Sequence, residues 1–220
     1  MLLVTLSVSS VIVSGVIFHS IWLMIIQSIL NTLCVFTQAK GKIINQFIGV
    51  VAFIFYAAIC FQQKFYGEVL LYCTIIIPVY VYGSIHWLKN KSKINNVVIV
   101  KDNISKKEWI ISSMVYAGLT IAIYFLLKAL NTEQLIVSTL SFITILPGIY
   151  LLIRRCKWNQ LAFLINDLIV PILWIVLLVN GSLYVWPVFI SFIFQLMFDV
   201  YGFFEWIKLA KQQKQQNLNH

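Results

Sequence analysis

Long apolar runs separated by short polar clusters dominate the hydrophobic pattern of this chain. A helix needs about 20 apolar residues to cross the hydrocarbon core of a bilayer. Windows of that length fit between the charged clusters at residues 8–30, 43–61, 67–88, 109–128, 134–153, 159–179 and 183–207. The first window differs from a signal peptide, because it has no positively charged start and no obvious small-residue cleavage site. The pattern therefore predicts an all-α membrane protein with seven transmembrane helices.

The composition agrees with a membrane protein. The chain is 61% hydrophobic and only 10% charged, whereas a soluble domain carries roughly a quarter charged residues. Seven spans leave two of the sixteen basic residues, Lys64 and Lys128, on one side of the membrane. The others fall on the opposite side: Lys40, Lys42, Lys89, Lys91, Lys93, Lys101, Lys106, Lys107, Arg154, Arg155, Lys157, Lys208, Lys211 and Lys214. By the positive-inside rule we expect the N-terminus outside and the C-terminus in the cytoplasm. The net charge of +9 thus reflects topology, and no nucleic-acid partner is expected.

Two similar stretches indicate an internal duplication. "VYGSIHWLK" at 81–89 and "VYGFFEWIK" at 200–208 each close a long apolar run. Asn45-Gln46 opens the second window as Asn159-Gln160 opens the sixth, at nearly the same distance from the closing motif. The sequence therefore predicts two three-helix repeats.

A single linker helix is needed between the repeats, because three is an odd number and the second copy must return to the orientation of the first. Parallel repeats of this kind are related by an axis along the membrane normal and place a substrate site between them, which suggests a transporter. The predicted division is a first repeat at 1–88, a cytoplasmic loop and linker helix at 89–133, a second repeat at 134–208 and a cytoplasmic tail at 209–220.

Polar residues form a stripe on each of the last two predicted helices. Gln195, Asp199, Gly202 and Trp206 follow the spacing i, i+4, i+7, i+11, which is one helix face. The sixth window repeats the design with the following residues, and Asn166 lies beside them: Gln160, Phe163, Asp167, Pro171 and Trp174. Two acidic helix faces in one bundle predict a polar cavity.

The energetics of burial define the candidate site. A carboxylate at the bilayer centre costs about 2.5 to 3.5 kcal/mol on insertion scales and faces protein or a water-filled cavity. The candidate substrate-binding residues are Gln160, Phe163, Asn166, Asp167, Trp174, Gln195 and Asp199. Two alternatives remain, a helix-to-helix hydrogen bond for Asp167 and pairing near the cytoplasmic interface for Asp199. The first repeat offers aromatic faces at Tyr56, Tyr72 and Tyr80, and this combination suits a flat heteroaromatic ring with hydroxyls or a positive charge.

Motifs of enzymes and pumps are missing from the sequence. There is no HExxH, no GxSxG and no Gly-rich phosphate loop. The cysteines have no CxxC spacing. We therefore expect no enzyme activity, no cofactor and no metal, and a passive or ion-coupled carrier of a small molecule in the lipid bilayer.

The chain resembles the PnuC family of bacterial vitamin transporters. The resemblance covers about Gly41 to Lys208 and is carried by "GKIINQFIGVVAFIFYAAICFQQKFYGEVLLYCTIIIPVYVYGSIHWLK" and its partner "NQLAFLINDLIVPILWIVLLVNGSLYVWPVFISFIFQLMFDVYGFFEW". It implies a three-plus-one-plus-three fold related to the SWEET sugar transporters. It also implies facilitated diffusion of nicotinamide riboside with trapping by cytoplasmic kinases, in a multi-pass protein of the bacterial cytoplasmic (inner) membrane. A homo-oligomer also fits the resemblance.

One stretch departs from the family pattern. Members that carry nicotinamide riboside typically have Asn-Trp-x-x-Trp at the start of the sixth span and an Asn one turn later. This chain has Asn159-Gln160-x-x-Phe163 and then Asp167. Asp167 would match a cationic ring. Related members carry thiamine, riboflavin or deoxynucleosides, and these solutes stay open, as do a non-transporting membrane subunit and a proton-coupled symporter that uses Asp167 and Asp199.

Overall fold

The computed structural model describes residues 2–92, 97–101 and 104–218. Within them the regular secondary structure is helical, apart from two isolated β-bridges. The helices are α1 (Leu2–Ile17), α2 (Trp22–Ala39), α3 (Ile44–Gln62), α4 (Tyr66–Leu71), η1 (Tyr72–Ile76), α5 (Ile77–Lys89), α6 (Lys106–Ala129), α7 (Leu135–Ile153), α8 (Asn159–Asp167), α9 (Val170–Val179), η2 (Leu183–Val185) and α10 (Trp186–Leu218). The all-α prediction is confirmed.

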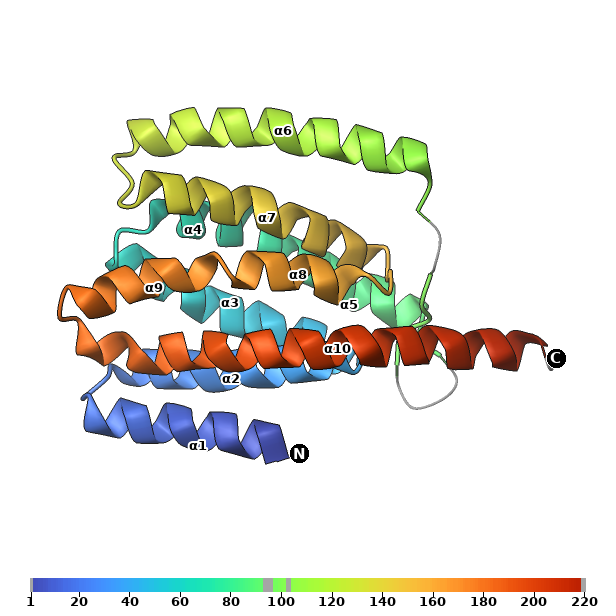
Figure 1. The fold of residues 1–220 in the computed structure, drawn as a ribbon, viewed down its shortest axis with the longest axis horizontal. Helices are drawn as coiled ribbons and strands as arrows, with labels where there is room; N and C mark the ends of the chain where they lie inside the picture. Colours follow the sequence, from blue (N-terminus) through green and yellow to red (C-terminus); the bar gives the residue numbers. More distant parts are fainter. Residues whose placement is uncertain (1, 93–96, 102–103, 219–220) are drawn as a thin grey trace.

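Seven helical segments of the described chain are long and apolar enough to cross a membrane, as predicted. They are α2, α3, α4 to α5, α6, α7, α8 to α9, and η2 to α10. Figure 1 shows them side by side and alternating in direction. The ends of α2, α5 and α7, with the long extension of α10, lie at one end of the bundle, which we name the basic end because Lys40, Lys89 and Arg154 follow or close these helices.

The predicted first span at 8–30 is wrong. The chain stops α1 at Ile17 and begins α2 at Trp22. His19 has a φ of 50°, and the Ser20 N–H donates to the Gly15 carbonyl at 2.9 Å. This is the hydrogen bond of a helix that ends on a left-handed residue. Glycine usually occupies that position, and because a histidine does so here, the apolar pattern gave no sign of the break.

Helix α1 is an additional element outside the seven spans. Its 16 residues are about 24 Å long at 1.5 Å per residue, which is shorter than the hydrocarbon core of about 30 Å. It runs antiparallel to α2 and packs on α2 and α10 (Figure 1). The Ser7 and Thr32 hydroxyls join α1 to α2 at 2.9 Å. Because α1 folds back beside α2, the first residues of the chain lie away from the end at which α2 starts (Figure 1), and the external N-terminus stays a prediction.

Two of the spans are interrupted near the middle of the bundle. The third span contains the π-helical turn η1 just before Pro78, and the sixth span breaks between α8 and α9 just before Pro171. Proline has no N–H to donate, and its ring clashes with the preceding turn of a helix. Both interruptions lie beside the pocket described below, so the backbone around the pocket is irregular.

The linker helix α6 forms an outer layer of the bundle. It packs on α7 (Figure 1), and Leu127 is its only buried residue. Its first turn has a capping box in which the Ser105 hydroxyl accepts from the Glu108 N–H at 3.1 Å. Glu108 also pairs with Arg154, which directly follows α7, at 2.9 Å. The linker helix is thus fixed at the basic end and otherwise faces outward.

Candidate functional site

A pocket lies at the centre of the bundle between the two predicted repeats. Its lining comes from α2, α3, η1 and α5 on one side and from α7, α8 and α10 on the other. The lining residues are Gln27, Asn31, Val35, Gln38, Phe53, Tyr56, Tyr72, Ile76, Tyr80, Ile145, Ile149, Phe163, Asn166, Asp167, Phe192, Gln195 and Asp199. The pocket is therefore shared by chain segments far apart in sequence.

Two carboxyl groups form the most polar part of the pocket. Asp167 at the end of α8 and Asp199 of α10 are each 1% exposed, and their side chains are in contact with each other. The Oδ2 atom of each has no hydrogen-bond partner among the described residues. Two charged carboxylates this close would repel each other. The pair is suited to a ligand that brings hydrogen-bond donors or positive charge.

Amide side chains surround this carboxyl pair. Gln195 of α10 contacts Asp167 and accepts a hydrogen bond from Asn31 of α2 at 2.8 Å. Asn166 donates to the Ser141 carbonyl and to the Thr144 hydroxyl of α7, both at 3.0 Å. These bonds hold the polar residues of α2, α7, α8 and α10 in one layer.

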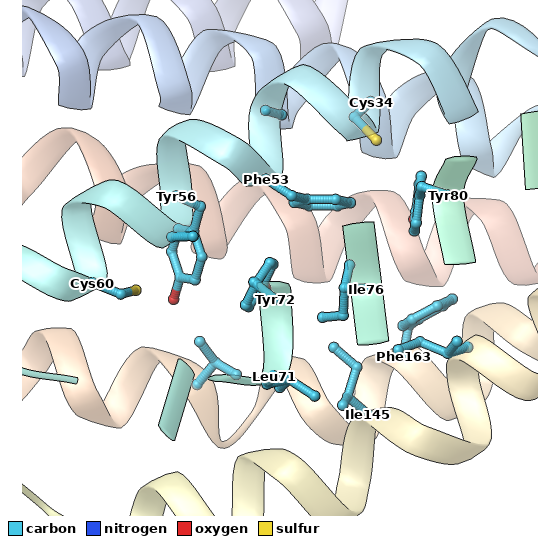
Figure 2. Packing of buried hydrophobic residues seen from close by; sticks show 14 of the residues in the cluster. Cys34, Phe53, Tyr56, Cys60, Leu71, Tyr72, Ile76, Tyr80, Ile145 and Phe163 are labelled. Carbon is cyan, nitrogen blue, oxygen red and sulfur yellow. The ribbon is translucent and has the colours of Figure 1, made fainter. Parts of the chain in front are cut away.

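The first repeat contributes an aromatic wall. Figure 2 shows Phe53 between Tyr56 and Tyr80, with Tyr72 and Ile76 facing them. The ring centroids of Phe53 and Tyr80 are 4.8 Å apart at 84°, and those of Tyr56 and Tyr72 are 4.6 Å apart. Such contacts fix the orientation of the rings. A flat ligand in the pocket would stack against aromatic faces on one side and meet the carboxyl pair on the other.

A polar layer closes the pocket toward the basic end. The Tyr80 hydroxyl donates to Gln38 Oε1 at 2.6 Å, and Asn45 Nδ2 donates to the same oxygen at 3.4 Å. The Trp206 indole N–H donates to the Gln38 carbonyl at 2.9 Å. A Cβ atom at Gly202 would lie 2.9 Å from Ala39 Cα. Helices α2 and α10 are therefore packed too tightly here for a solute to pass.

An aromatic layer closes the opposite end. The Trp174 indole N–H donates to the Tyr56 hydroxyl at 3.3 Å. Phe65 packs on the edge of Trp174 with ring centroids 5.7 Å apart, and Phe192 lies 6.0 Å from Tyr56. Because α3 and α9 belong to different predicted repeats, this layer joins the two repeats.

The pocket has a small volume in this structure. The centres of water-sized spheres reach about 40 Å³ of it, which is room for about three water molecules at 10–15 Å³ each. A vitamin or nucleoside is several times larger than that. The pocket in this structure is therefore too small for such a solute.

The structure brings together five of the seven candidate residues. Phe163, Asn166, Asp167, Gln195 and Asp199 all line the pocket. Gln160 is fully buried nearer the basic end, where a Cβ at Gly202 would lie 3.0 Å from its Cδ, and Trp174 belongs to the aromatic layer. Helical periodicity indicates which face of a helix a residue lies on but not its depth along the helix, so these two residues lie outside the pocket lining.

Three polar residues of the pocket were missed by the sequence interpretation. Gln27, Asn31 and Gln38 line the pocket from α2 and are 2%, 5% and 4% exposed. Their spacing of i, i+4 and i+11 is the same signal that identified α8 and α10. The wrong window at 8–30 ended before two of them, so the stripe was not recognised.

The described residues include no group of three or more His, Cys, Asp or Glu side chains placed to hold a metal ion. The arrangement instead offers carboxyl and amide oxygens opposite aromatic faces, in a membrane-embedded pocket closed by two separate layers. Such an arrangement is chemically suited to binding a polar aromatic solute.

Comparisons with known proteins agree with one another. The family described as Nicotinamide mononucleotide transporter matches residues 21–208. The Nicotinamide riboside transporter PnuC of Neisseria mucosa is 24% identical over 201 residues, which cover 89% of this chain and 75% of that protein. The protein of the same name from Haemophilus influenzae is 24% identical over 198 residues, covering 87% and 81%.

A solved structure shares the fold. The crystal structure of the Vitamin B3 transporter PnuC superposes with a TM-score of 0.84 at 22% identity, over 95% of this chain and 90% of that one. The arrangement of the seven spans is therefore that of a solved membrane protein.

Proposed function

Since the chain belongs to the nicotinamide mononucleotide transporter family, we propose that it carries nicotinamide riboside, or a related vitamin or nucleoside, across the bacterial inner membrane. It is a multi-pass membrane transporter and belongs to a family of carriers, not of enzymes. The relatives named above are nicotinamide riboside transporters, and this solute is accordingly the first to test. Thiamine, riboflavin and deoxynucleosides are the next.

The carboxyl pair in the pocket is the observation that carries the proposal. A pyridinium or thiazolium ring is flat and positively charged, so it stacks on aromatic faces and is attracted to a carboxylate. Asp167 and Asp199 line the same pocket as Phe53, Tyr72 and Tyr80. A cationic heteroaromatic solute therefore satisfies both walls at once.

The two closing layers support alternating access. The layer at Gln38, Tyr80 and Trp206 closes the basic end, and the layer at Tyr56 and Trp174 closes the other. A solute must open one layer at a time to pass by facilitated diffusion. We propose that the two repeats rock about the pocket, and that phosphorylation in the cytoplasm then traps the solute.

The proposed sidedness follows from the basic residues. With the basic end in the cytoplasm, α2 starts outside, and the C-terminal part of α10 lies inside. The loop after α5 packs against this end, because the Val98 N–H donates to the Gly41 carbonyl at 2.9 Å and the Lys101 N–H donates to the Arg155 carbonyl at 3.0 Å. A homo-oligomer remains a prediction from the family resemblance.

The test is a binding titration of the purified full-length protein with nicotinamide riboside, thiamine, riboflavin and a deoxynucleoside. We expect micromolar binding of one compound and weaker binding to Asp167→Asn. The matched control is Glu133→Gln, the same acid-to-amide change at an exposed position. No binding of any of the four compounds would contradict the proposal.

A flux measurement in liposomes separates the alternatives. A carrier moves the bound compound without other proteins, whereas a non-transporting subunit gives no flux. If an uncoupler abolishes uptake when no trapping kinase is present, the protein is a proton symporter and facilitated diffusion is wrong.

A further inference from the structure

Glu68 is a buried acid that the pocket does not use. It lies on α4, is 1% exposed and does not line the pocket. Neither of its carboxyl oxygens has a hydrogen-bond partner within the described chain. Glu108 differs in burial and in pairing, since it is partly exposed and pairs with Arg154 at 2.9 Å. No ion pair like that of Glu108 therefore compensates a negative charge on Glu68.

The surroundings of Glu68 are polar but not basic. On α7, the hydroxyls of Ser138 and Ser141 are buried and likewise lack partners among the residues described, and Ser141 lies beside the carboxyl group. Tyr56 and Cys60 of α3 and Tyr72 of η1 are the titratable groups that face it. These neighbours bring hydroxyl and thiol groups and no lysine or arginine.

Helices α4 and α7 approach closely at this point. A Cβ atom at Gly67 would lie 2.9 Å from Ser138 Cβ and 3.1 Å from a methyl carbon of Leu127. Helix α4 belongs to the first predicted repeat and α7 to the second. The acid and the two hydroxyls therefore lie in the contact between the repeats, where any change of charge acts on both.

Electrostatics decide the state of this acid. An isolated carboxylate in a low-dielectric interior is so unfavourable that the group takes up a proton instead. A neutral carboxylic acid has one O–H donor, and a serine hydroxyl can accept it. A metal ion needs several ligands, and no cluster of three or more His, Cys, Asp or Glu residues exists in the described part of the chain. A proton needs only the one partner that Ser141 provides.

We propose that Glu68 is a proton-binding site that holds the two repeats together across α4 and α7. Neither group has a hydrogen-bond partner among the described residues, so a proton on Glu68 would allow the neutral acid to donate to the neighbouring Ser141 hydroxyl. The carbonyl of the same Ser141 accepts from Asn166 of the pocket at 3.0 Å. Loss of the proton leaves a buried charge that is stabilised only when α4 and α7 separate and water enters. Opening of this contact is therefore linked to release of a proton from Glu68.

Infrared spectroscopy of the purified full-length protein tests the proposal without any solute. A protonated carboxylic acid has a C=O band distinct from that of a carboxylate. We expect Glu68→Gln to lose one such protonated-acid band at neutral pH and exposed Glu133→Gln to keep all of them. Ser141→Ala keeps the acid but removes its acceptor, so the band moves to higher frequency. This second variant retains the test if Glu68→Gln does not fold.

Thermal unfolding gives a second measurement. A group that binds its proton more strongly in the folded state makes the protein less stable as pH rises. The wild-type melting temperature should fall from mildly acidic to alkaline pH, and Glu68→Gln should flatten this fall. A protonated-acid C=O band that is the same in wild type and Glu68→Gln would overturn the proposal. A second result would also overturn it. If replacing K⁺ by Na⁺ raised the melting temperature of wild type but not of Glu68→Gln, Glu68 would bind a metal cation and not a proton.

Discussion

Asn31 on α2 donates a hydrogen bond of 2.8 Å to Gln195 on α10, across 164 positions of sequence. Gln195 in turn contacts Asp167 of α8, which contacts Asp199. One chain of polar contacts thus runs from the first repeat through the pocket to both acidic helices. The geometry of the carboxyl pair depends on a residue of the other repeat.

Replacing Asn31 should disturb the pocket from a distance. Asn31→Ala leaves Gln195 Oε1 without its donor, and an unsatisfied polar group of this kind costs about 1–3 kcal/mol. We expect a lower free energy of unfolding in detergent and weaker binding of the solute. Asn180→Ala is the matched control, since Asn180 is exposed at the end of α9. Equal stability of the two variants would show that the Asn31 bond is unimportant.

Removing one hydroxyl should weaken the layer at the basic end. Tyr80→Phe keeps the ring but deletes the 2.6 Å bond to Gln38 Oε1, at a cost of about 1 kcal/mol. We expect a lower melting temperature and faster dissociation of bound solute, because this end opens more easily.

Tyr82 provides the comparison for that variant. It lies on the same helix and is 54% exposed. Its hydroxyl forms no hydrogen bond with other described residues. Tyr82→Phe should leave melting temperature and dissociation rate unchanged, and a larger effect at Tyr82 than at Tyr80 would contradict the assignment of the layer.

A methyl group at Gly202 should separate α2 from α10. The added Cβ would lie 2.9 Å from both Ala39 Cα and Ala39 Cβ, and overpacking of this kind costs about 1–3 kcal/mol. Thermal unfolding should show Gly202→Ala to be destabilised. Gly118→Ala on α6 should be neutral or slightly stabilised, because that position has open space around it and alanine favours a helix by up to about 1 kcal/mol.

The sequence predicted the pocket where charge and helical spacing coincide. Asp167 and Asp199 are costly in a membrane, so their presence on apolar helices required a polar cavity, and the i, i+4, i+7 spacing gave its direction. Both line the pocket. The amides Gln27, Asn31 and Gln38 cost less to bury and lay across a helix boundary that the apolar pattern could not locate.

Other features depend on contacts between distant residues. Nothing near His19 in the sequence marks its left-handed conformation, since that position usually needs glycine. Glu68 lies two residues inside its helix, where an acid usually faces water, and the approach of α3 and α7 buries it. The depth of Gln160 and Trp174 follows from how the helices stack, which a one-helix periodicity does not contain.

The outward position of α6 means that its sequence is constrained differently from the sequences of the packed helices. Leu127 is the only residue of α6 that is buried. Nearly every other side chain of the helix is therefore constrained by the surrounding lipid and not by close packing against other helices. Because α6 crosses the membrane once, the second predicted repeat has the same orientation in the membrane as the first. Most of α6 is therefore free to exchange one apolar residue for another, whereas α2 and α10 must keep their surfaces matched to each other as the chain evolves.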